Sequence, residues 1–349
     1  MSLRLIQDLI ADIFLSLPVK SLKRFRCLSK SCCHEIDSAA FTKAHLNRSI
    51  QTKTHRKLIF QDQHSDVCAI EFTGTKLDNV PAAFKDYKYH DSKFWGSCNG
   101  LVLLSALSLE GLDELWLWPP FTRQRKKLPD CPRCCYIEVG LGYDPLTNDY
   151  KVVQIPACCE CNEEDSLNCV FSLASNTWRQ LQLPFPLIRT IRGIYWNAVF
   201  LDGALHWMSH SDHELTIIIT IVSFDVSKEE FNVDLIPGFQ LPIPNYYRWN
   251  YYYDMSLEVL QGSLVFCHRI SKHDHIELSY YAAKHGQWTK LYKLDLSYCS
   301  STNWERNHFK IYEVSKDMGI KFCCKSGDFF IGMALNPEAW RDWELVQCV

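Results

Sequence analysis

The sequence predicts a small all-α segment of three short helices, followed by an all-β, propeller-like domain of five or six four-stranded blades. Apolar residues recur at helical spacing over residues 5–46, whereas short β-branched and aromatic runs alternate with turn residues from residue 57 onward. A strand–turn–strand pattern also repeats along this second part. A β-sandwich with irregular strands is the alternative, and the repeat favours the propeller.

Three short helices are expected over residues 5–46. Leu9 and Ile13 lie four residues apart, which places both side chains on one face of the first helix. Pro18 ends that helix and can begin the second, because a residue in a first turn needs no N–H donor. Asp8 is the candidate N-cap of the first helix, and Ser29 can cap the third. So short a segment buries little apolar surface, and we expect a partner to cover the remainder.

The repeat consists of paired hairpins. Asn99-Gly100 and Asp202-Gly203 are strong hairpin signals, because a type I′ turn requires positive φ at both central residues. A second hairpin with a polar turn follows each time, so that a four-stranded unit recurs roughly every 45 to 55 residues. We expect residues 57–73 and 318–335 to pair and close the ring. The first hairpins are FWGSCNGLVLLS (94–105), NAVFLDGALHWMS (197–209) and LEVLQGSLVFCH (257–268).

Composition excludes several classes of protein. The net charge of −3 argues against a general polyanion binder. The N-terminus lacks the pattern of a signal peptide, and the apolar runs are too short for a membrane helix. The 17 cysteines are odd in number and include adjacent pairs, which favours reduced thiols. We therefore expect a soluble protein of the cytoplasm, the nucleus or both.

Residues 5–46 resemble an F-box of the large plant family, and the rest of the chain resembles its F-box-associated domain, which is propeller-like and kelch-related. The resemblance implies an F-box at 1–46, a linker at 47–56 and a substrate-recognition domain at 57–349. The motifs that carry it follow the family's order: SCNGLVLL, LGYDPLTNDYKVVQI, VFSLASNTWRQL, LDGALHW, VSFDVSKEEF and WTKL.

This resemblance implies a non-catalytic adaptor without a cofactor. Its partners would be a Skp-type adaptor and, through it, a cullin and a RING subunit of a ubiquitin ligase. A target protein would bind the other domain, and neither nucleic acid nor a membrane is expected as a partner. Two alternatives stay open: a scaffold that acts without the ligase, and a metal-dependent propeller enzyme. No phosphate loop or nucleophile elbow supports the enzyme.

The F-box resemblance also implies the residues that contact the Skp-type adaptor. The chain departs from the family pattern at Ile6, where Pro is usual, and at Cys32, where Trp is usual. Replacing a large core side chain by a small one costs about 3–5 kcal/mol unless another group fills the space, and Cys33 or Phe41 can do so. The implied contacts are Leu5, Leu9, Ile13, Leu17, Pro18, Val19, Leu22 and Phe25.

Cations cluster beside these residues, at Lys20, Lys23, Arg24, Arg26 and Lys30. In a chain of slightly negative net charge, they favour contact with an acidic protein surface. At such a contact, charge contributes more to orientation and association rate than to affinity. A solvated helix face is the alternative.

Target binding is expected on the face of the propeller that carries the longer connections, because binding residues gather on loops of a rigid scaffold. These connections include residues 209–220, 238–256 and 268–276. The segment QLPIPNYYRWNYYYD (240–254) combines Tyr, Trp and Arg, the residues enriched at interface hot spots. Packing of these rings between blades is the alternative. The target-binding candidates are Tyr246, Tyr247, Arg248, Trp249, Tyr251 and Tyr252.

No metal is expected, although two Cys-x-x-Cys pairs form a candidate zinc site. The pairs are separated by residues 135–157, which is longer than usual for a zinc ribbon, and loosely ordered thiols are the simpler interpretation. The candidate ligands are Cys131, Cys134, Cys158 and Cys161.

Overall fold

The structure is a computed structural model in which the chain forms two compact units. The first unit comprises Met1–Lys93 and Asn99–Lys127, and the second unit comprises Phe94–Cys98 and Leu128–Val349. It describes residues 2–52, 57–61, 67–72, 77–79, 89–108, 113–120, 124–131, 137–156, 168–181, 192–194, 198–213, 216–242, 255–260, 262–272, 275–284, 287–295, 309–315, 319–326, 328–334 and 346–347.

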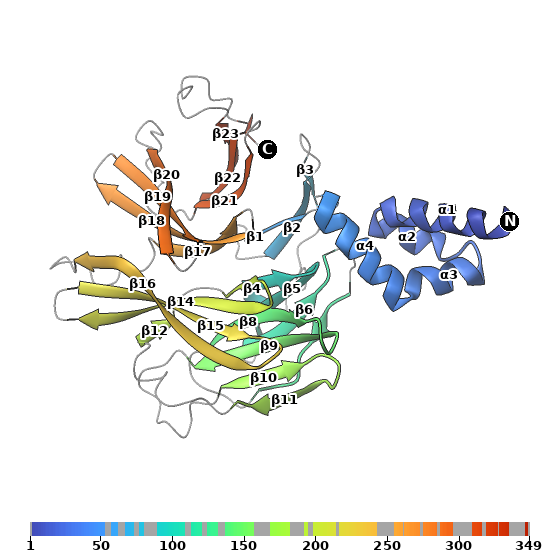
Figure 1. Cartoon of the computed structure of the whole chain (residues 1–349), viewed down its shortest axis with the longest axis horizontal. Helices are drawn as coiled ribbons and strands as arrows, with labels where there is room; N and C mark the ends of the chain where they lie inside the picture. Colours follow the sequence, from blue (N-terminus) through green and yellow to red (C-terminus); the bar gives the residue numbers. More distant parts are fainter. Residues whose placement is uncertain are drawn as a thin grey trace. The chain divides into compact units, whose positions relative to one another are not determined.

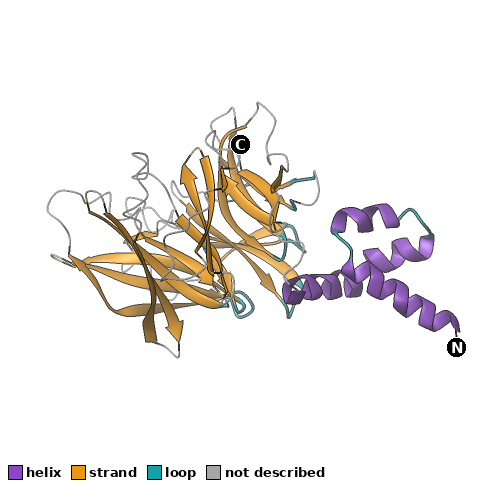
Figure 2. Cartoon of the chain, turned by 90° about the horizontal axis from the view of Figure 1, so that it is seen from above, coloured by secondary structure: helices purple, strands orange, loops and turns teal. Residues whose placement is uncertain are grey.

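The N-terminal segment forms four helices rather than the predicted three (Figures 1 and 2). They are α1 (Ser2–Ser16), α2 (Val19–Phe25), α3 (Lys30–Asp37) and α4 (Ala39–Thr52). The extra boundary lies at Ser38, whose extended backbone ends α3 and whose Oγ accepts a hydrogen bond from the Phe41 amide at 3.1 Å. This is the geometry of an N-cap. Because no Gly or Pro follows within the helix, α4 continues to Thr52 and includes residues 47–52 of the expected linker.

Two of the three predicted helix starts are confirmed, whereas the prediction of Asp8 as an N-cap is wrong, because α1 begins at Ser2 and Asp8 lies within it. Pro18 precedes α2, and its carbonyl accepts hydrogen bonds from the amides of Ser21 and Leu22 at 2.9 and 3.0 Å. Ser29 precedes α3, and its Oγ accepts from the Cys32 amide at 3.0 Å. Local sequence chemistry therefore determines where both helices begin.

The described strands form six antiparallel sheets (Figure 1). The first sheet comprises β1 (Lys57–Gln61), β2 (Val67–Phe72) and β3 (Leu77–Asn79). The second sheet comprises β4 (Tyr89–Cys98), β5 (Leu101–Ser108), β6 (Asp113–Trp118) and β7 (Lys126–Lys127). The third comprises β8 (Ile137–Asp144), β9 (Asp149–Pro156), β10 (Cys169–Ser172) and β11 (Thr177–Gln180). The fourth comprises β12 (Arg192–Ile194), β13 (Val199–Leu201), β14 (Ala204–His213), β15 (Thr216–Asp225) and β16 (Glu230–Pro242).

The fifth sheet comprises β17 (Met255–Leu260), β18 (Ser263–Lys272), β19 (His275–Lys284) and β20 (Gln287–Asp295). The sixth sheet comprises β21 (Phe309–Ser315), β22 (Gly319–Ser326), β23 (Asp328–Ala334) and β24 (Val346–Gln347). Most of these sheets follow chain order, as expected for a propeller-like domain. The expected pairing of residues 57–73 with 318–335 is wrong, because these segments belong to separate sheets. Each finds antiparallel partners next to it in the chain, and the number of blades stays a prediction.

The type I′ turns are confirmed. Asn99 and Gly100 have φ values of 50° and 81°, and Asp202 and Gly203 have φ values of 49° and 82°. Positive φ at both positions matches the right-handed twist of the flanking strands, which explains the Asn-Gly and Asp-Gly pairs.

Two of the expected long connections are short. β14 ends at His213 and β15 begins at Thr216, and β18 ends at Lys272 while β19 begins at His275. The prediction of long loops at 209–220 and 268–276 is therefore wrong. The β-branched residues 216–222 extend the ladder of β14 and β15 from Ala204↔Asp225 to His213↔Thr216. The 243–254 part of the third connection lies outside the described residues.

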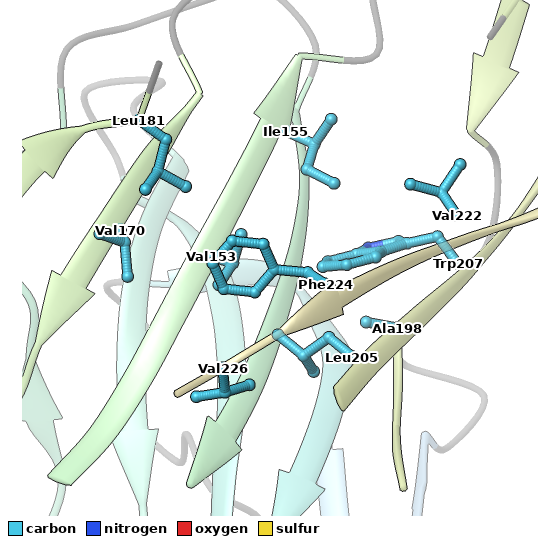
Figure 3. Packing of buried hydrophobic residues seen from close by; sticks show 10 residues of the cluster. All are labelled: Val153, Ile155, Val170, Leu181, Ala198, Leu205, Trp207, Val222, Phe224 and Val226. Carbon is cyan, nitrogen blue, oxygen red and sulfur yellow. The ribbon is translucent and has the colours of Figure 1, made fainter. Parts of the chain in front are cut away.

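The main core of the second unit joins the sheet β8–β11 to the sheet β12–β16 (Figure 3). Trp207 and Phe224 are fully buried in this core, whereas Met208 points into a second core shared with β17 and β18. Successive side chains of β14 thus enter opposite cores, as the period of a strand requires. Contacts of β8 with β13 and β14, and of β17 with β13, β14 and β21, continue this packing from sheet to sheet.

Candidate functional site

The first helix exposes large apolar side chains. Leu9 is 55% exposed, Ile13 is 56% exposed, and Ile10 between them is also exposed. Leu9 and Ile13 are four residues apart, and Ile10 and Ile13 are three apart, so the three side chains are neighbours on the helix surface. We call these three residues the apolar ridge.

A separate core holds the four helices together. Phe14, Leu22, Ile36 and Phe41 are buried in it, and Leu15, Leu17, Phe25 and Cys32 pack against it. The Phe14 and Phe25 rings lie 5.8 Å apart between centroids. Because this core excludes the apolar ridge, the ridge is not needed to hold the helices and is left available to a partner.

The link between α1 and α2 is held by α4. The carbonyl of Leu17 accepts a hydrogen bond from His45 Nε2 at 2.8 Å, which assigns the proton of the buried imidazole to that nitrogen. The His45 ring stacks on Phe41. Leu17, Pro18 and Val19 are half-buried at this link. The orientation of α2 against α1 is therefore determined by a hydrogen bond as well as by packing.

The predicted adaptor contacts fall into three groups. Leu9 and Ile13 belong to the exposed ridge, and Leu17, Pro18, Val19 and Phe25 are half-buried. Leu22 is only 5% exposed and lies in the helical core, so its first role is to support the fold. Leu5 lies in α1, but its side chain is outside the description, as is that of Ile6.

Sequence reasoning missed two exposed apolar residues in α1 and in the turn after α2. Ile10 belongs to the ridge, and its spacing of three residues from Ile13 was a sufficient signal. Leu28 is 64% exposed in the turn that follows α2, where no periodicity could have identified it.

The departure at Cys32 is accommodated in the helical core. Cys32 is half-buried and packs against the buried side chains, among which Phe41 supplies an aromatic ring. Cys33, the other residue expected to fill the space of a Trp, is also half-buried. That Phe41 or Cys33 compensates for the missing Trp stays a prediction.

The cations of α2 gather on its solvent side. Lys20, Lys23 and Arg24 are exposed, and none of them forms an ion pair with another described residue. Arg26 differs, because its guanidinium lies 2.6 Å from a carboxylate oxygen of Asp37. A positively charged surface without internal compensation thus accompanies the apolar ridge in the helical segment.

The remaining sequence-predicted sites lie mostly outside the described residues. These include the target-binding candidates Tyr246, Tyr247, Arg248, Trp249, Tyr251 and Tyr252, and the cysteines Cys134, Cys158 and Cys161. Cys131 is described as a half-buried, free cysteine. Across the described part of the chain, no group of three or more His, Cys, Asp or Glu side chains is placed to hold a metal ion.

The turns of the second unit are joined by a buried ionic network. Lys151 Nζ donates to Asp144 Oδ2, Glu229 Oε1 and the Val226 carbonyl, each at 2.9 Å. Ser227 Oγ also donates to Asp144 Oδ1 at 2.7 Å. The network connects the β8–β9 turn to the β15–β16 turn.

Comparison with known proteins identifies two matching families. The F-box domain matches residues 2–43, and the F-box associated beta propeller domain matches residues 49–256.

None of the helices in the described part of the chain has the length and hydropathy of a membrane span.

Several curated plant proteins are similar to this chain. F-box protein CPR1 of Arabidopsis thaliana is 31% identical over 257 residues, covering 66% of this chain and 59% of that protein. F-box protein At4g22390 of the same plant is 26% identical, covering 82% of this chain and 73% of that protein. Among solved structures, the Aleuria aurantia lectin has a TM-score of 0.43 at 10% identity, covering 83% of this chain and 88% of the lectin.

Proposed function

Because the chain belongs to the F-box associated beta propeller domain family and also carries an F-box domain, we propose that it is the substrate-recognition subunit of a Skp–cullin–F-box ubiquitin ligase. The F-box binds a Skp-type adaptor, which brings the cullin and the RING subunit. The strand domain holds a target protein. Other subunits transfer ubiquitin, so this chain contributes binding surfaces and no catalytic group.

The apolar ridge is the observation that carries this proposal. Leu9 and Ile13 are more than half exposed, although the helices have a core of their own. Full burial of a Leu or Ile side chain contributes about 1.5–3 kcal/mol. A partner that covers the ridge therefore gains several kcal/mol without any rearrangement of the helices. Such a preformed surface is what a docking module requires.

The exposed cations of α2 support the same proposal. Lys20, Lys23 and Arg24 lie at spacings of three and four residues, where like charges weaken a helix by about 0.2–0.5 kcal/mol per pair. An acidic adaptor surface removes this repulsion. Because the cations are solvent-exposed, their main contribution is to the rate and orientation of docking.

Target binding is assigned to the connection between β16 and β17. Its segment 243–254 contains the Tyr, Trp and Arg side chains that are enriched at hot spots. This part of the proposal rests on sequence. It predicts that a bound target protects this segment from proteolysis.

Co-expression with a plant Skp-type adaptor, followed by size-exclusion chromatography, tests the docking step. The wild-type chain is expected to co-elute with the adaptor at equal stoichiometry, whereas a Leu9→Asp/Ile13→Asp variant is expected to elute alone. These exposed positions are preferable to Leu22, because a charge placed in the helical core unfolds the F-box itself. Leu146→Asp is the matched control, since Leu146 is 82% exposed in a turn of the other unit and is expected to leave docking unchanged.

Helical circular dichroism must match between the wild type and the ridge variant, so that loss of docking reports on the surface. If the folded wild-type chain ignores several Skp paralogues, the ligase proposal fails. The departures at Ile6 and Cys32 then favour the scaffold that acts without a ligase. If the ridge variant still co-elutes, docking occurs elsewhere and the role assigned to the ridge is wrong.

A further inference from the structure

One serine of the helical segment follows two arginines at a spacing that kinases with basic substrates recognise. Ser29 has Arg26 three residues before it and Arg24 five residues before it. No other Ser or Thr in the whole sequence has Arg three residues before it. Kinases of this class select substrates by charge pattern, because acidic groups in their peptide cleft bind the guanidinium groups. The spacing therefore distinguishes Ser29 from every other Ser and Thr of the chain.

The segment around Ser29 is accessible to another protein. Residues 26–30 are all exposed, and they join α2 to the first turn of α3. The backbone of Ser29 is extended, with φ of −160° and ψ of 164°. Its Oγ accepts a hydrogen bond from the Cys32 amide at 3.0 Å and donates to no described residue. The hydroxyl proton is therefore left to solvent, where a kinase can remove it.

The contacts that hold the two arginines are ones that a kinase can displace. Arg24 is exposed and forms no ion pair with a described residue. Arg26 pairs with Asp37, but these side chains are 44% and 46% exposed, and surface ion pairs of this kind are weak. The turn after α2 is closed by a hydrogen bond from the Leu28 amide to the Phe25 carbonyl. Because Leu28 is itself exposed, opening this turn uncovers no core side chain at that position.

We propose that Ser29 is a phosphorylation site for a serine/threonine kinase that recognises basic substrates, and that phosphate at Ser29 weakens docking to the Skp-type adaptor. The effect on docking rests on the proposed function. In the reaction, Ser29 Oγ attacks the γ-phosphorus of ATP, and the bond from that phosphorus to the oxygen that bridges it to the β-phosphorus breaks. ADP leaves with this oxygen, and the hydroxyl proton passes to the carboxylate base of the kinase.

The phosphate changes the charge of the surface that docking is proposed to use. Lys23 and Arg24 lie in the last turn of α2, and the hydrogen-bonded turn that follows ends directly before Ser29. A phosphoserine carries about −1.5 to −2 charges at neutral pH, which offsets most of the charge of these two cations. An acidic adaptor surface then meets less positive charge, so association slows. Helix α3 tolerates the phosphate, because negative charge is favourable at a helix N-terminus.

Phosphorylation of the full chain in vitro tests the site. The chain is incubated with Mg-ATP and a purified AGC-type kinase that requires Arg three and five residues before the serine, and mass spectrometry locates the phosphate. Phosphate is expected on Ser29 in the wild type and is expected to be lost in an Arg24→Gln/Arg26→Gln variant. Ser38 is the matched control, because its Oγ also caps a helix but Glu35 lies three residues before it. It is expected to stay unmodified.

Two substitutions separate the charge of the phosphate from the cap that Ser29 provides. Ser29→Asn and Ser29→Asp both keep a good N-cap residue and prevent phosphorylation, but only Asp adds a negative charge. Biolayer interferometry against an immobilised Skp-type adaptor measures the association rate. The phosphorylated wild type is expected to associate about fivefold more slowly than the unphosphorylated chain at low salt, with a smaller reduction for Ser29→Asp and none for Ser29→Asn. High salt is expected to reduce these differences, because it screens exposed charges.

Three results overturn the proposal. The first is an unmodified Ser29 after treatment with a kinase that is active on a standard peptide. The second is phosphorylation of Ser29 that persists in the double-arginine variant. The third is an unchanged association rate after complete phosphorylation. If the unphosphorylated chain binds no Skp-type adaptor, the proposed function and the effect on docking both fail, whereas mass spectrometry alone decides whether Ser29 is modified.

Discussion

Replacement of Lys151 by Met is expected to destabilise the strand domain more than any surface charge change. The Lys151 side chain is 9% exposed, and that of Asp144 is 1% exposed. Methionine keeps the length and most of the apolar stem of lysine but removes the ammonium group. The substitution therefore leaves the Asp144 carboxylate buried without its cation.

The expected cost is about 3 kcal/mol. Removing one partner of a buried ion pair typically costs about 3–5 kcal/mol. The low end of this range of free energies applies to Lys151→Met, because the Asp144 carboxylate keeps three other hydrogen bonds. Their donors are the Leu146 amide, Thr147 Oγ1 and Ser227 Oγ, at 2.9, 2.7 and 2.7 Å. With a urea dependence of about 3 kcal/mol per M for a domain of this size, the midpoint falls by about 1 M.

The cost also depends on pH. Burial by itself raises the pKa of Asp144, but hydrogen bonds from Lys151, Ser227, Thr147 and the Leu146 amide lower it well below its usual value. A carboxylate with a depressed pKa stabilises the fold above its unfolded pKa of about 4 and loses this contribution as the pH falls further. The difference in the free energy of unfolding between the wild type and Lys151→Met is therefore largest at neutral pH, and it becomes smaller below a pH of about 4.

Urea unfolding followed by tryptophan fluorescence measures this cost in the full chain. The first of the 11 tryptophans in the sequence is Trp95, so the signal reports on the strand domain without a contribution from the helices. Lys228→Met is the control, because Lys228 is 69% exposed and 3.4 Å from Asp225. Such a surface pair contributes about 0–1 kcal/mol. Equal midpoint shifts for the two variants would refute the assignment of Lys151 to a buried network.

Further substitutions test the packing. Gly140→Ala is expected to cost about 1–3 kcal/mol, because its Cβ would lie 2.6 Å from Ala198 Cβ and 2.9 Å from Trp207 Cζ2; urea unfolding measures this. Gly203→Ala has open space around the Cβ but a φ of +82°, so a cost of about 1 kcal/mol is expected from backbone strain alone. Phe14→Ala is expected to cost about 3–5 kcal/mol in the helical core and to abolish adaptor docking together with helical circular dichroism.

Much of the local structure was predictable because it depends on neighbouring residues. Pro18 and Ser29 identified the starts of α2 and α3, and Asn99-Gly100 identified a turn with positive φ. The cap at Ser38 carried the same kind of signal but was overlooked, which explains the missed helix boundary. The extended ladder of β14 and β15 was not predicted, since the expectation of a long loop outweighed its β-branched residues.

The amino-acid sequence alone determined the order of helices and strands, the tight turns and the family, because each depends on local backbone preference or on motifs in a fixed order. Only the tertiary structure decided that Leu9 and Ile13 are exposed while Leu22 is buried, although all three are apolar residues of expected helices. It also brought the ammonium of Lys151 to the carboxylate of Glu229, which is 78 residues away in the sequence. Exposure and long-range contacts depend on how elements pack, and packing joins residues whose separation in the sequence carries no signal of their proximity.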